Sequence, residues 1–311
     1  MTSVIEIEGL RKEYRHRRGR AQVAVDGLDL EVPEGGVYGF LGPNGSGKTT
    51  TIRCLLGLAR PTAGSCRLLG VPTPARVGQV IGRVGAIVET PALFPTMSGR
   101  RNLALLARTA GIGPKPVDVA LDRVGLAERA GDQVRTYSLG MRQRLGLAQA
   151  LLKDPEVLIL DEPANGLDPA GIKEIRELLR SLGDEGRTVF VSSHLLVEIE
   201  HTCDRVAILS RGQCVAAGRV SEVLRRGHRS RLRVGLADLD AGLTVLLDAG
   251  IPAARNHTCL EVDLPPADAA RVSRALGERQ LWVTEMHADE ATLEDVFLEL
   301  TADPVAEEVG R

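Results

Sequence analysis

The sequence lacks long apolar runs, paired cysteines and a strong net charge. No run of about 18 apolar residues occurs, so we expect no segment to cross a bilayer as a helix. The N-terminal residues do not have the shape of a signal peptide. Internal repeats and low-complexity segments are also absent, which leaves an ordinary globular protein as the class to examine.

Charge and cysteine usage exclude further classes. The net charge is -2 and the isoelectric point is near 6.3, which argues against a protein that binds nucleic acid along its whole chain. The five cysteines are scattered with no C-x-x-C pair, which predicts free thiols in a reducing compartment, not a disulfide framework or zinc site. With 43% hydrophobic and 26% charged residues over 311 positions, the chain is long enough for two domains.

One segment fits the phosphate-binding pattern G-x-x-x-x-G-K-[ST]. It consists of Gly42, Pro43, Asn44, Gly45, Ser46, Gly47, Lys48 and Thr49. The apolar residues 37–41 before it predict a buried strand, and residues 50–56 after it predict a helix. Glycines let the backbone wrap around a phosphate, and a helix N-terminus attracts the anion. We expect Lys48 to reach the β- and γ-phosphates, Thr49 to ligate Mg²⁺ and Thr50 to line the same site. A glycine-rich turn that merely precedes a lysine is the disfavoured alternative.

A second segment ends an apolar strand with two acids. Residues 157–160 are wholly apolar and lead directly to Asp161 and Glu162, which we expect to emerge at the carboxyl edge of a sheet. Asp161 would hold Mg²⁺ through its water shell, and Glu162 would orient or deprotonate an attacking water. The alternative is a surface Asp-Glu pair at a strand end, which becomes improbable beside the phosphate-binding pattern.

Two further positions are weaker candidates. Ser138 lies before a predicted helix over residues 139–152, and with Gly140 it would form another anion site; taken alone, ordinary helix capping is the better interpretation. His194 follows the apolar strand 188–193 and is a candidate γ-phosphate sensor, although a lone histidine at such a place is usually structural. Residues 165–168 indicate a turn.

The pattern along the chain predicts an α/β sheet with a helical insertion. Residues 98–153 are predicted to be helical, with a break at two prolines. Strands are predicted at 4–8, 21–25, 28–32, 65–69, 157–160, 188–193 and 206–209, with a helix at 172–182 and a solvated loop at 11–20. An arginine-rich stretch around Gly227 indicates a linker, followed by a small α/β domain in which Trp282 and Phe297 are expected in the core.

Together these motifs resemble the nucleotide-binding subunit of an ATP-binding cassette (ABC) transporter over about residues 4–220. The resemblance implies a P-loop NTPase cassette at residues 1–220, with a mixed sheet core, an antiparallel β part and a helical subdomain at about 90–153. A small C-terminal α/β domain follows at residues 225–311. Residues 42–49 correspond to Walker A, 157–162 to Walker B, 138–141 to the signature motif and 165–168 to the D-loop. His194 corresponds to the switch histidine.

The resemblance also implies the ligands and partners. Tyr14 lies where the family stacks an aromatic ring on adenine, with a strand-end tyrosine as the alternative. Two cassettes of this family hold two ATP molecules and Mg²⁺ between them, so Ser138 and Gly140 would act on the nucleotide of a second subunit. A homodimer is expected, bound peripherally to the cytoplasmic face of the cell membrane through a separate transmembrane permease. No nucleic acid is expected as a partner.

Two departures from the family pattern refine the expected function. The signature reads Tyr137-Ser138-Leu139-Gly140-Met141, where Leu139 replaces a glycine and can alter the local geometry. Glu89 stands where most of the family has glutamine, as in export ATPases of bacitracin and lantibiotic resistance. A carboxylate there can meet Mg²⁺ or its waters, and we expect Glu89 to couple the nucleotide site to the membrane partner without being the main base.

The predicted function is therefore an ATPase that drives export of a drug, antibiotic or similar compound. Residues 292–300 are similar to the tail of many bacterial export ATPases, which favours this subclass. A soluble ABC ATPase acting on ribosomes or nucleic acid is an alternative, but those usually carry two cassettes or long coiled coils. An importer subunit is the nearer alternative. The transported compound is not specified by this chain, because a membrane subunit lines the path.

Overall fold

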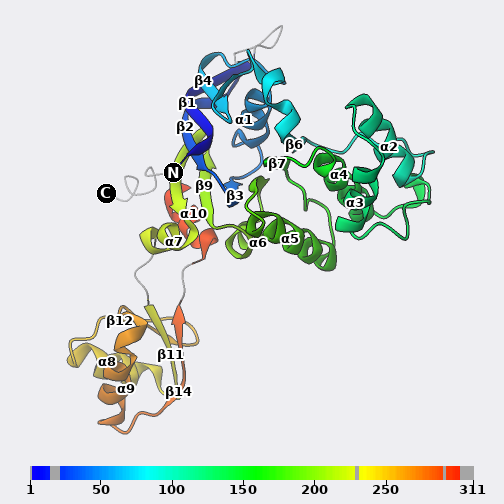
Figure 1. Ribbon diagram of the computed structural model, residues 1–311. Coiled ribbons are helices and arrows are strands. Elements are labelled where there is room, and N and C mark those ends of the chain that lie inside the picture. The colour runs from blue at the N-terminus through cyan, green and yellow to red at the C-terminus, as the bar shows by residue number, and fades with distance from the viewer. Residues whose placement is uncertain (1, 15–21, 228–230, 290–291, 302–311) are drawn as a thin grey trace. The chain divides into compact units, whose positions relative to one another are not determined.

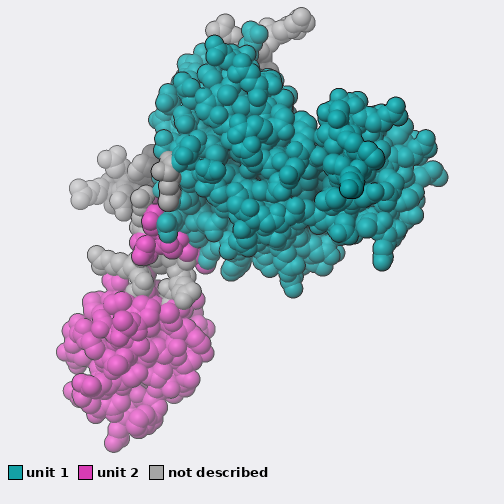
Figure 2. Space-filling model, in the orientation of Figure 1, with its two compact units in different colours: residues 1–220 teal, residues 221–311 magenta. Residues whose placement is uncertain are grey.

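The computed structural model describes residues 2–14, 22–227, 231–289 and 292–301. The chain forms two compact units, residues 1–220 and 221–311 (Figure 2). Each unit has its own cluster of buried side chains, and Val, Leu and Ile dominate both clusters. Among the residues described, none of the helices has the length and hydropathy needed to cross a membrane.

A six-stranded sheet forms the centre of the first unit, in the order β10-β9-β3-β8-β7-β6 (Figure 1). Its parallel strands are β3 (Gly36–Leu41), β6 (Val84–Ile87), β7 (Val157–Asp161), β8 (Thr188–Ser193) and β9 (Arg205–Ser210), and β10 (Gln213–Arg219) is antiparallel to β9. Every residue of β7 and β8 is buried, which confirms the strands predicted from apolar runs. Because β3, β7 and β8 are parallel, their carboxyl ends meet at one edge of the sheet.

Helices cover both faces of this sheet. The helix α1 (Lys48–Leu55) packs on one face, while α5 (Pro169–Asp184) and α6 (Leu196–Thr202) pack on the other. The α5–α6 face accommodates the helices closely: a Cβ on Gly39 would lie 2.5 Å from Ile199, and one on Gly183 would lie 2.9 Å from Val37. On the opposite face, α1 contacts β7 on one side and a second layer of the unit on the other, so it is packed between them.

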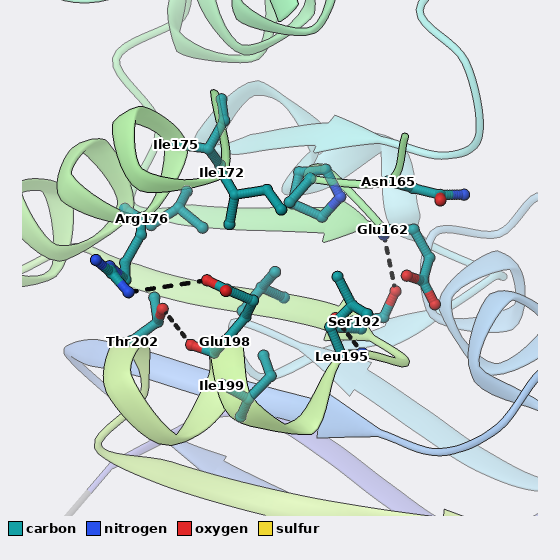
Figure 3. Close-up of a pocket in the computed structure, with 15 residues that line it drawn as sticks. Glu162, Asn165, Ile172, Ile175, Arg176, Ser192, Leu195, Glu198, Ile199 and Thr202 are labelled. Carbon is teal, nitrogen blue, oxygen red and sulfur yellow. Dashed lines mark hydrogen bonds and ion pairs between the residues drawn. The ribbon is translucent and has the colours of Figure 1, made fainter. Parts of the chain in front are cut away.

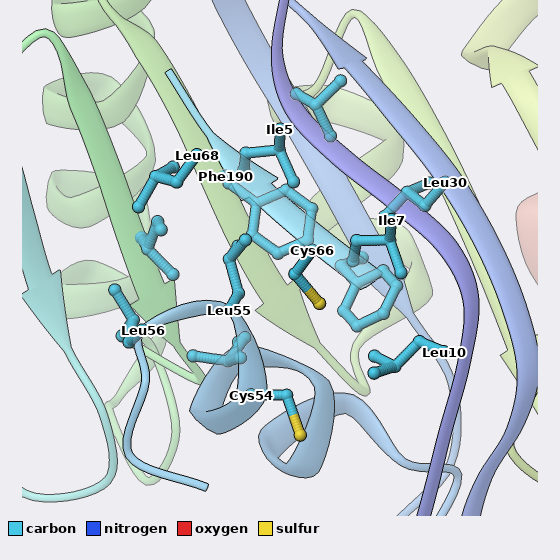
Figure 4. Close-up of a cluster of buried hydrophobic side chains, with 14 of the residues drawn as sticks. Ile5, Ile7, Leu10, Leu30, Cys54, Leu55, Leu56, Cys66, Leu68 and Phe190 are labelled. Carbon is cyan, nitrogen blue, oxygen red and sulfur yellow. The ribbon is translucent and has the colours of Figure 1, made fainter. Parts of the chain in front are cut away.

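That second layer is an antiparallel sheet in the order β2-β1-β4-β5. It comprises β1 (Ser3–Tyr14), β2 (Gln22–Pro33), β4 (Ala63–Leu68) and β5 (Val71–Thr73). Figure 4 shows how Ile5, Ile7 and Leu10 of this sheet lie beside Leu55 of α1 and Phe190 of β8. Full burial of such side chains stabilises each by roughly 1.5–3 kcal/mol relative to exposure, so this cluster holds α1 in place.

The first two strands are longer than the sequence indicates. Residues 11–14 extend β1 instead of starting a loop, and residues 15–20 of the predicted loop lie outside the described part of the chain. The predicted strands 21–25 and 28–32 form one strand, β2. Gly9 and Gly27 have positive φ at irregularities in the β1–β2 register. The sequence predicts a turn at Gly27, because this glycine lies between two apolar runs. In the structure Gly27 instead lies at a β-bulge within one strand.

The helical insertion contains α2 (Gly99–Thr109), α3 (Lys115–Arg123) and α4 (Leu139–Leu151). Pro114 is the N-cap of α3, which confirms the predicted break. Residues 124–138 are less helical than predicted. The only helical element that they contain is the 3₁₀ turn Val134–Thr136. Outside the insertion, the described residues form further 3₁₀ turns at Val77–Gln79, Ile81–Arg83 and Pro266–Asp268.

The second unit contains a four-stranded antiparallel sheet in the order β12-β13-β11-β14. Its elements are α7 (Val220–Gly227), β11 (Arg231–Leu236), α8 (Leu239–Asp248), β12 (Ala253–Arg255), β13 (Leu260–Val262), α9 (Ala269–Gly277), β14 (Val283–Asp289) and α10 (Leu293–Thr301). From β11 to β14 the chain follows the β-α-β-β-α-β order of ferredoxin-like units.

One expectation for this region is wrong, and another is tested only in part. The linker expected around Gly227 is helical up to that residue, in α7, while residues 228–230 lie outside the described part of the chain. Trp282 is 74% exposed, although it was expected in the core. Leu281 and Val283 both pack against the core, and alternation along the chain turns the residue between them outward. Phe297 is half-buried on α10.

Candidate functional site

The loop after β3 folds tightly because its glycines have no side chain. Gly47 has a φ of +107°, and a Cβ there would lie 2.5 Å from the carbonyl oxygen of Ala24 on β2. A Cβ on Gly42 would lie 2.4 Å from Oγ of Ser46 and 2.5 Å from the carbonyl oxygen of Leu209. The loop is therefore held between β2 and β9 at the carboxyl edge of the sheet.

The loop and the start of α1 gather hydrogen-bond donors at this edge. Lys48 is only 5% exposed, and its Nζ donates to the carbonyl oxygens of Gly42 at 2.6 Å and Pro43 at 3.3 Å. Ser46 is buried, and its Oγ has no hydrogen-bond partner within the described residues. Pro43, Asn44 and Gly45 are exposed. A buried ammonium, an unpartnered hydroxyl and a helix N-terminus form a donor set that suits a phosphate group.

Thr49 and Thr50 lie in the first turn of α1 and are half-buried. Both side chains are thus partly exposed and directly follow Lys48 in the chain. A Thr hydroxyl is a hard oxygen ligand of the kind that Mg²⁺ accepts.

Asp161 and Glu162 leave β7 at the same edge but differ in burial. Asp161 is 4% exposed, and its Oδ1 accepts a hydrogen bond from Oγ of Ser192 at 2.5 Å. It therefore remains inside the sheet, and the expectation that both acids emerge holds only for Glu162. Glu162 has a φ of +51°, which is uncommon for a residue other than glycine. Such a conformation redirects the chain sharply after the strand.

Glu162 lies between a lysine and a histidine. Its Oε1 is 3.2 Å from Nζ of Lys48, without the angles of a hydrogen bond, and its Oε2 is 2.7 Å from Nδ1 of His194. The backbone N–H of His194 also donates to Oε2, at 3.3 Å. Because an ionised carboxylate only accepts, Nδ1 of His194 must carry the proton in this contact, which leaves Nε2 for another partner. Three candidate residues from separate segments thus form one charged group.

The oxygen ligands at this edge suit Mg²⁺ better than a metal ion whose ligands all come from protein side chains. No cluster of three or more His, Cys, Asp or Glu in the described residues could hold a metal ion by itself. Mg²⁺ usually keeps several waters and binds through one or two carboxylates together with substrate phosphates. Asp161 and Thr49 therefore fit this ion.

Ser138 and Gly140 belong to a different part of the unit. Ser138 is exposed and caps α4, accepting a hydrogen bond from the N–H of Met141 at 3.2 Å. Gly140 is half-buried in the first turn of that helix. Within the described residues, neither of them forms a hydrogen bond or ion pair with Lys48, Glu162 or His194. The structure thus confirms that Ser138 caps this helix.

The signature segment packs against the D-loop. Leu139 is 42% exposed, and a Cβ on Gly166 would lie 3.1 Å from its Cδ2. The observed turn covers residues 163–166 and so overlaps the turn predicted at 165–168. Two residues later Asp168 caps α5 by accepting a hydrogen bond from the N–H of Gly171 at 3.0 Å. The two motifs therefore lie side by side, and Leu139 fills the space above Gly166.

Glu89 and Tyr14 are not drawn into the charged group. Glu89 follows β6 with a φ of +64°, is exposed, and pairs with Arg53 on α1. Tyr14 is half-buried at the end of β1, with Nζ of Lys12 lying 5.0 Å from the centre of its ring. The structure thus gives Glu89 a basic partner and leaves Tyr14 on the antiparallel sheet, whose neighbouring strand passes over the loop.

Sequence reasoning missed Ser192 and Arg53. Ser192 is fully buried and touches both acids, and Arg53 binds Glu89. The signal for Ser192 was present, because a hydroxyl in an otherwise apolar strand must find a partner when it is buried. Arg53 gives no such signal, since an arginine in a helix is usually solvated.

An apolar pocket lies beside the charged group, between α5, α6 and β8 (Figure 3). Its walls include Ile172, Ile175 and Ile199, while Glu162 and Ser192 lie at one end. The guanidinium of Arg176 and the carboxylate of Glu198 face each other at 3.9 Å across it. The pocket therefore lies behind the site, and its guanidinium is already paired with a carboxylate.

Comparisons with known proteins agree with this geometry. The family model described as ABC transporter matches residues 25–165. The uncharacterized ABC transporter ATP-binding protein YhcH of Bacillus subtilis is 41% identical, covering 97% of each chain. The bacitracin transport ATP-binding protein BcrA of Bacillus licheniformis is 37% identical, covering 96% of this chain and 98% of its own. The daunorubicin resistance ATP-binding protein DrrA3 of Streptomyces coeruleorubidus is 36% identical, covering 97% and 96%.

Solved structures show the same fold. The chain matches cbiO1 of Clostridium perfringens, described as part of an ABC transporter complex, with a TM-score of 0.63 and 27% identity over 79% of this chain and 95% of that one. It also matches a dimeric, post-hydrolysis ATP-binding cassette bound to ADP and Pi, with a TM-score of 0.63 and 23% identity over 70% and 98% of the chains. Full-length relatives well above 30% identity leave one conclusion: this chain belongs to the ABC transporter ATP-binding protein family.

Proposed function

We propose that this chain is the ATP-hydrolysing subunit of an exporter and acts with a separate transmembrane subunit at the cytoplasmic face of the membrane. The observation that carries the proposal is the position of the Glu162 carboxylate between Lys48 and His194, beside a loop rich in donors. Phosphoryl transfer requires mainly positioning and charge neutralisation, which such a group supplies.

The nucleotide would lie on the loop of residues 42–47 and the start of α1. Lys48 would exchange its carbonyl partners for phosphate oxygens, and the buried Ser46 hydroxyl would gain the partner that it lacks within the described chain. Thr50 would line the same place, and Tyr14 would stack on adenine. Support for Tyr14 is its position on the sheet whose strand β2 contacts the loop through Ala24.

Thr49 and Asp161 would hold Mg²⁺ in this site. The ion neutralises charge on the phosphates during transfer. Asp161 is oriented by Ser192, whereas Glu89 pairs with Arg53. We therefore assign Glu89 to coupling with the membrane subunit, with at most an indirect contact to the ion through water.

Glu162 would orient and deprotonate the attacking water. His194 holds one of its oxygens and would sense the γ-phosphate through Nε2, the nitrogen that Glu162 does not use. General base catalysis of this kind contributes typically 10²–10⁴-fold.

A second copy of this chain would complete the site. Ser138 is exposed at the N-terminus of α4, where its hydroxyl and the helix dipole can meet an anion on another subunit, and Gly140 lies in the same turn. The cassette with ADP and Pi that shares this fold is dimeric, which supports a homodimer.

Export is favoured by the relatives that match over the full chain, including its C-terminal part. Their names specify bacitracin transport and daunorubicin resistance. Removal of a toxic compound is the class of transport that fits both names, so we propose a drug, antibiotic or similar compound as cargo. Neither a ribosome-associated ATPase nor an importer is favoured by these comparisons.

We further propose that residues 1–220 and 225–311 act as a cassette and an accessory domain, with the helical subdomain at about 90–153. The separate buried clusters of the two units support this division. Limited proteolysis should cut first near residue 228 and leave two resistant fragments. A single fragment, or first cuts inside β3 or β11, would count against the division.

The hydrolysis step is tested with Glu162→Gln. This variant should lose ATPase activity at least about 10²-fold yet bind ATP as the native chain does. Glu177→Gln, on the exposed face of α5, is the matched control and should behave as the native chain. Hydrolysis that survives in Glu162→Gln would refute the assignment.

The transport step is tested in inside-out membrane vesicles that contain the chain and the membrane protein that copurifies with it. ATP should drive uptake of the exported compound into such vesicles, and Glu162→Gln should abolish that uptake. ATP-dependent uptake in right-side-out vesicles alone would indicate import and overturn the exporter assignment.

A further inference from the structure

Ser192 lies at the centre of the catalytic edge. Its strand β8 lies between β3, which leads into the phosphate-binding loop, and β7, which ends in the two acids. In the parallel register it is opposite Phe40 on one side and Asp161 on the other. It is 0% exposed, so water does not compete for its hydroxyl.

The hydrogen bonds of this hydroxyl have fixed directions. The backbone N–H of Glu162 can only donate, so Oγ of Ser192 accepts from it at 3.0 Å. The one hydroxyl proton is then directed to Oδ1 of Asp161, 2.5 Å away. The carbonyl oxygen of Ser192 also accepts from the same N–H, at 3.2 Å. Both acids are thus attached to a single buried residue.

We propose that Ser192 is a positioning residue that presents the free oxygen of Asp161 to Mg²⁺ and holds Glu162 in its left-handed turn. The proposal rests on the ATPase function proposed above. Asp161 has two oxygens, and a proton donated to Oδ1 fixes the rotation of the carboxylate. The bond to the Glu162 N–H supports a backbone conformation that is otherwise disfavoured for a glutamate.

Partners of this kind are known to tune metal sites. Groups that hydrogen-bond a ligating carboxylate typically affect metal affinity or activity by about 10–100-fold when they are removed. The effect acts through orientation and not through contact with substrate. It should therefore appear mainly in the requirement for Mg²⁺.

The neighbouring Ser193 provides a matched control. It is on the same strand and is 8% exposed, and its Oγ accepts from the N–H of Leu195 at 2.9 Å. That bond stabilises the start of α6 and touches neither acid. Ser193→Ala therefore removes a buried hydroxyl from the same strand without disturbing Asp161 or Glu162.

The experiment measures binding of a fluorescent ADP to the full-length chain, with and without Mg²⁺, and ATPase activity as a function of Mg²⁺ concentration. Ser192→Ala should raise the Mg²⁺ concentration for half-maximal effect by about 10–100-fold, with metal-free ADP binding unchanged. Ser192→Thr keeps the hydroxyl and should restore most of the Mg²⁺ affinity. Ser193→Ala should match the native chain in both assays.

Two outcomes would overturn the proposal. One is a Ser192→Ala variant whose Mg²⁺ requirement equals that of Ser193→Ala. The other is an undiminished effect of Ser192→Ala in an Asp161→Asn background, where a residue acting through Asp161 should add little. If Ser192→Ala does not fold, Ser192→Cys keeps the size of the side chain with a weaker donor and should give an intermediate shift. A native chain without Mg²⁺-dependent ADP binding would instead refute the proposed function itself.

Discussion

In the first unit five parallel strands end at one edge, whereas in the second unit the strands alternate in direction. Parallel strands place every residue that follows their carboxyl ends at the same edge, so residues far apart in sequence meet there. Lys48, Glu162 and His194 meet in this way. In the second unit one ion pair, Arg231 with Glu261 at 3.9 Å, joins neighbouring antiparallel strands along their length instead.

The comparison indicates that strand direction decides where chemistry can be assembled. A sheet of alternating strands distributes its loops over two edges, so a ferredoxin-like unit of four short strands offers fewer convergent side chains at either edge. We therefore expect the cassette to carry hydrolysis, and the second unit to contribute by folding and contact alone.

The largest effect should come from the loop of the first unit. Lys48→Ala removes the buried ammonium beside Glu162 and should reduce ATPase activity by about 10²–10³-fold, because a preorganised charge at the phosphates is lost. Steady-state hydrolysis and ATP binding measure this. Lys173→Ala, on the exposed surface of α5, should leave both unchanged. ATPase activity close to native in Lys48→Ala would show that the catalytic group does not assemble at this edge of the parallel sheet.

A large effect confined to stability should come from the core of the second unit. Leu260→Ala empties a fully buried position on β13 and should destabilise that unit by about 2–5 kcal/mol. Hydrogen exchange should show faster exchange in residues 231–289 while the cassette keeps its protection and ATPase activity. Ile159→Ala, the equivalent change in β7, should lower both the hydrogen-exchange protection and the ATPase activity of the cassette. If Leu260→Ala and Ile159→Ala lost ATPase activity equally, hydrolysis would depend on the stability of the second unit as much as on that of the first.

A small effect is expected at the exposed acid of the cassette. Glu89→Gln breaks a solvent-exposed pair with Arg53, and such pairs contribute about 0.2–1 kcal/mol. ATPase activity should therefore change less than about fivefold, and Arg53→Gln should give a similar change. A loss of hydrolysis comparable to that of Glu162→Gln would make Glu89 part of the catalytic group.

The smallest effect concerns the reactivity of the cysteine thiols, which should differ between the two units and does not involve ATP hydrolysis. Burial raises the pKa of the Cys66 thiol to about 12, whereas Cys259 in the second unit is half-exposed. At pH 8 iodoacetamide should modify Cys259 well before Cys66 in the folded chain, as mass spectrometry can show. The folded state keeps a Cys66 proton that the unfolded state releases from about pH 9, so stability should fall as pH rises towards 12. Equal labelling rates in the folded protein would contradict this.

Local patterns predicted the phosphate-binding loop, the acids and the central strands, because each depends on residues adjacent in sequence. The pairing of Ser192 with Asp161 could not be predicted, since it depends on which strands are neighbours and in which register. Gly27 could not be assigned either, because a bulge and a turn require the same positive φ. Trp282 was misplaced because size favours burial, while alternation beside Leu281 and Val283 favours exposure.

The contact between Leu139 and Gly166 has a consequence for how the sequence can change over evolution. Any side chain larger than hydrogen at position 166 would have to fit within 3.1 Å of Leu139, and Gly166 also has a φ of +74°. A smaller residue at position 139 would relieve only the first of these constraints. Position 166 is therefore restricted twice, by the neighbouring side chain and by the backbone, and we expect it to stay glycine even in lineages where residue 139 has become smaller.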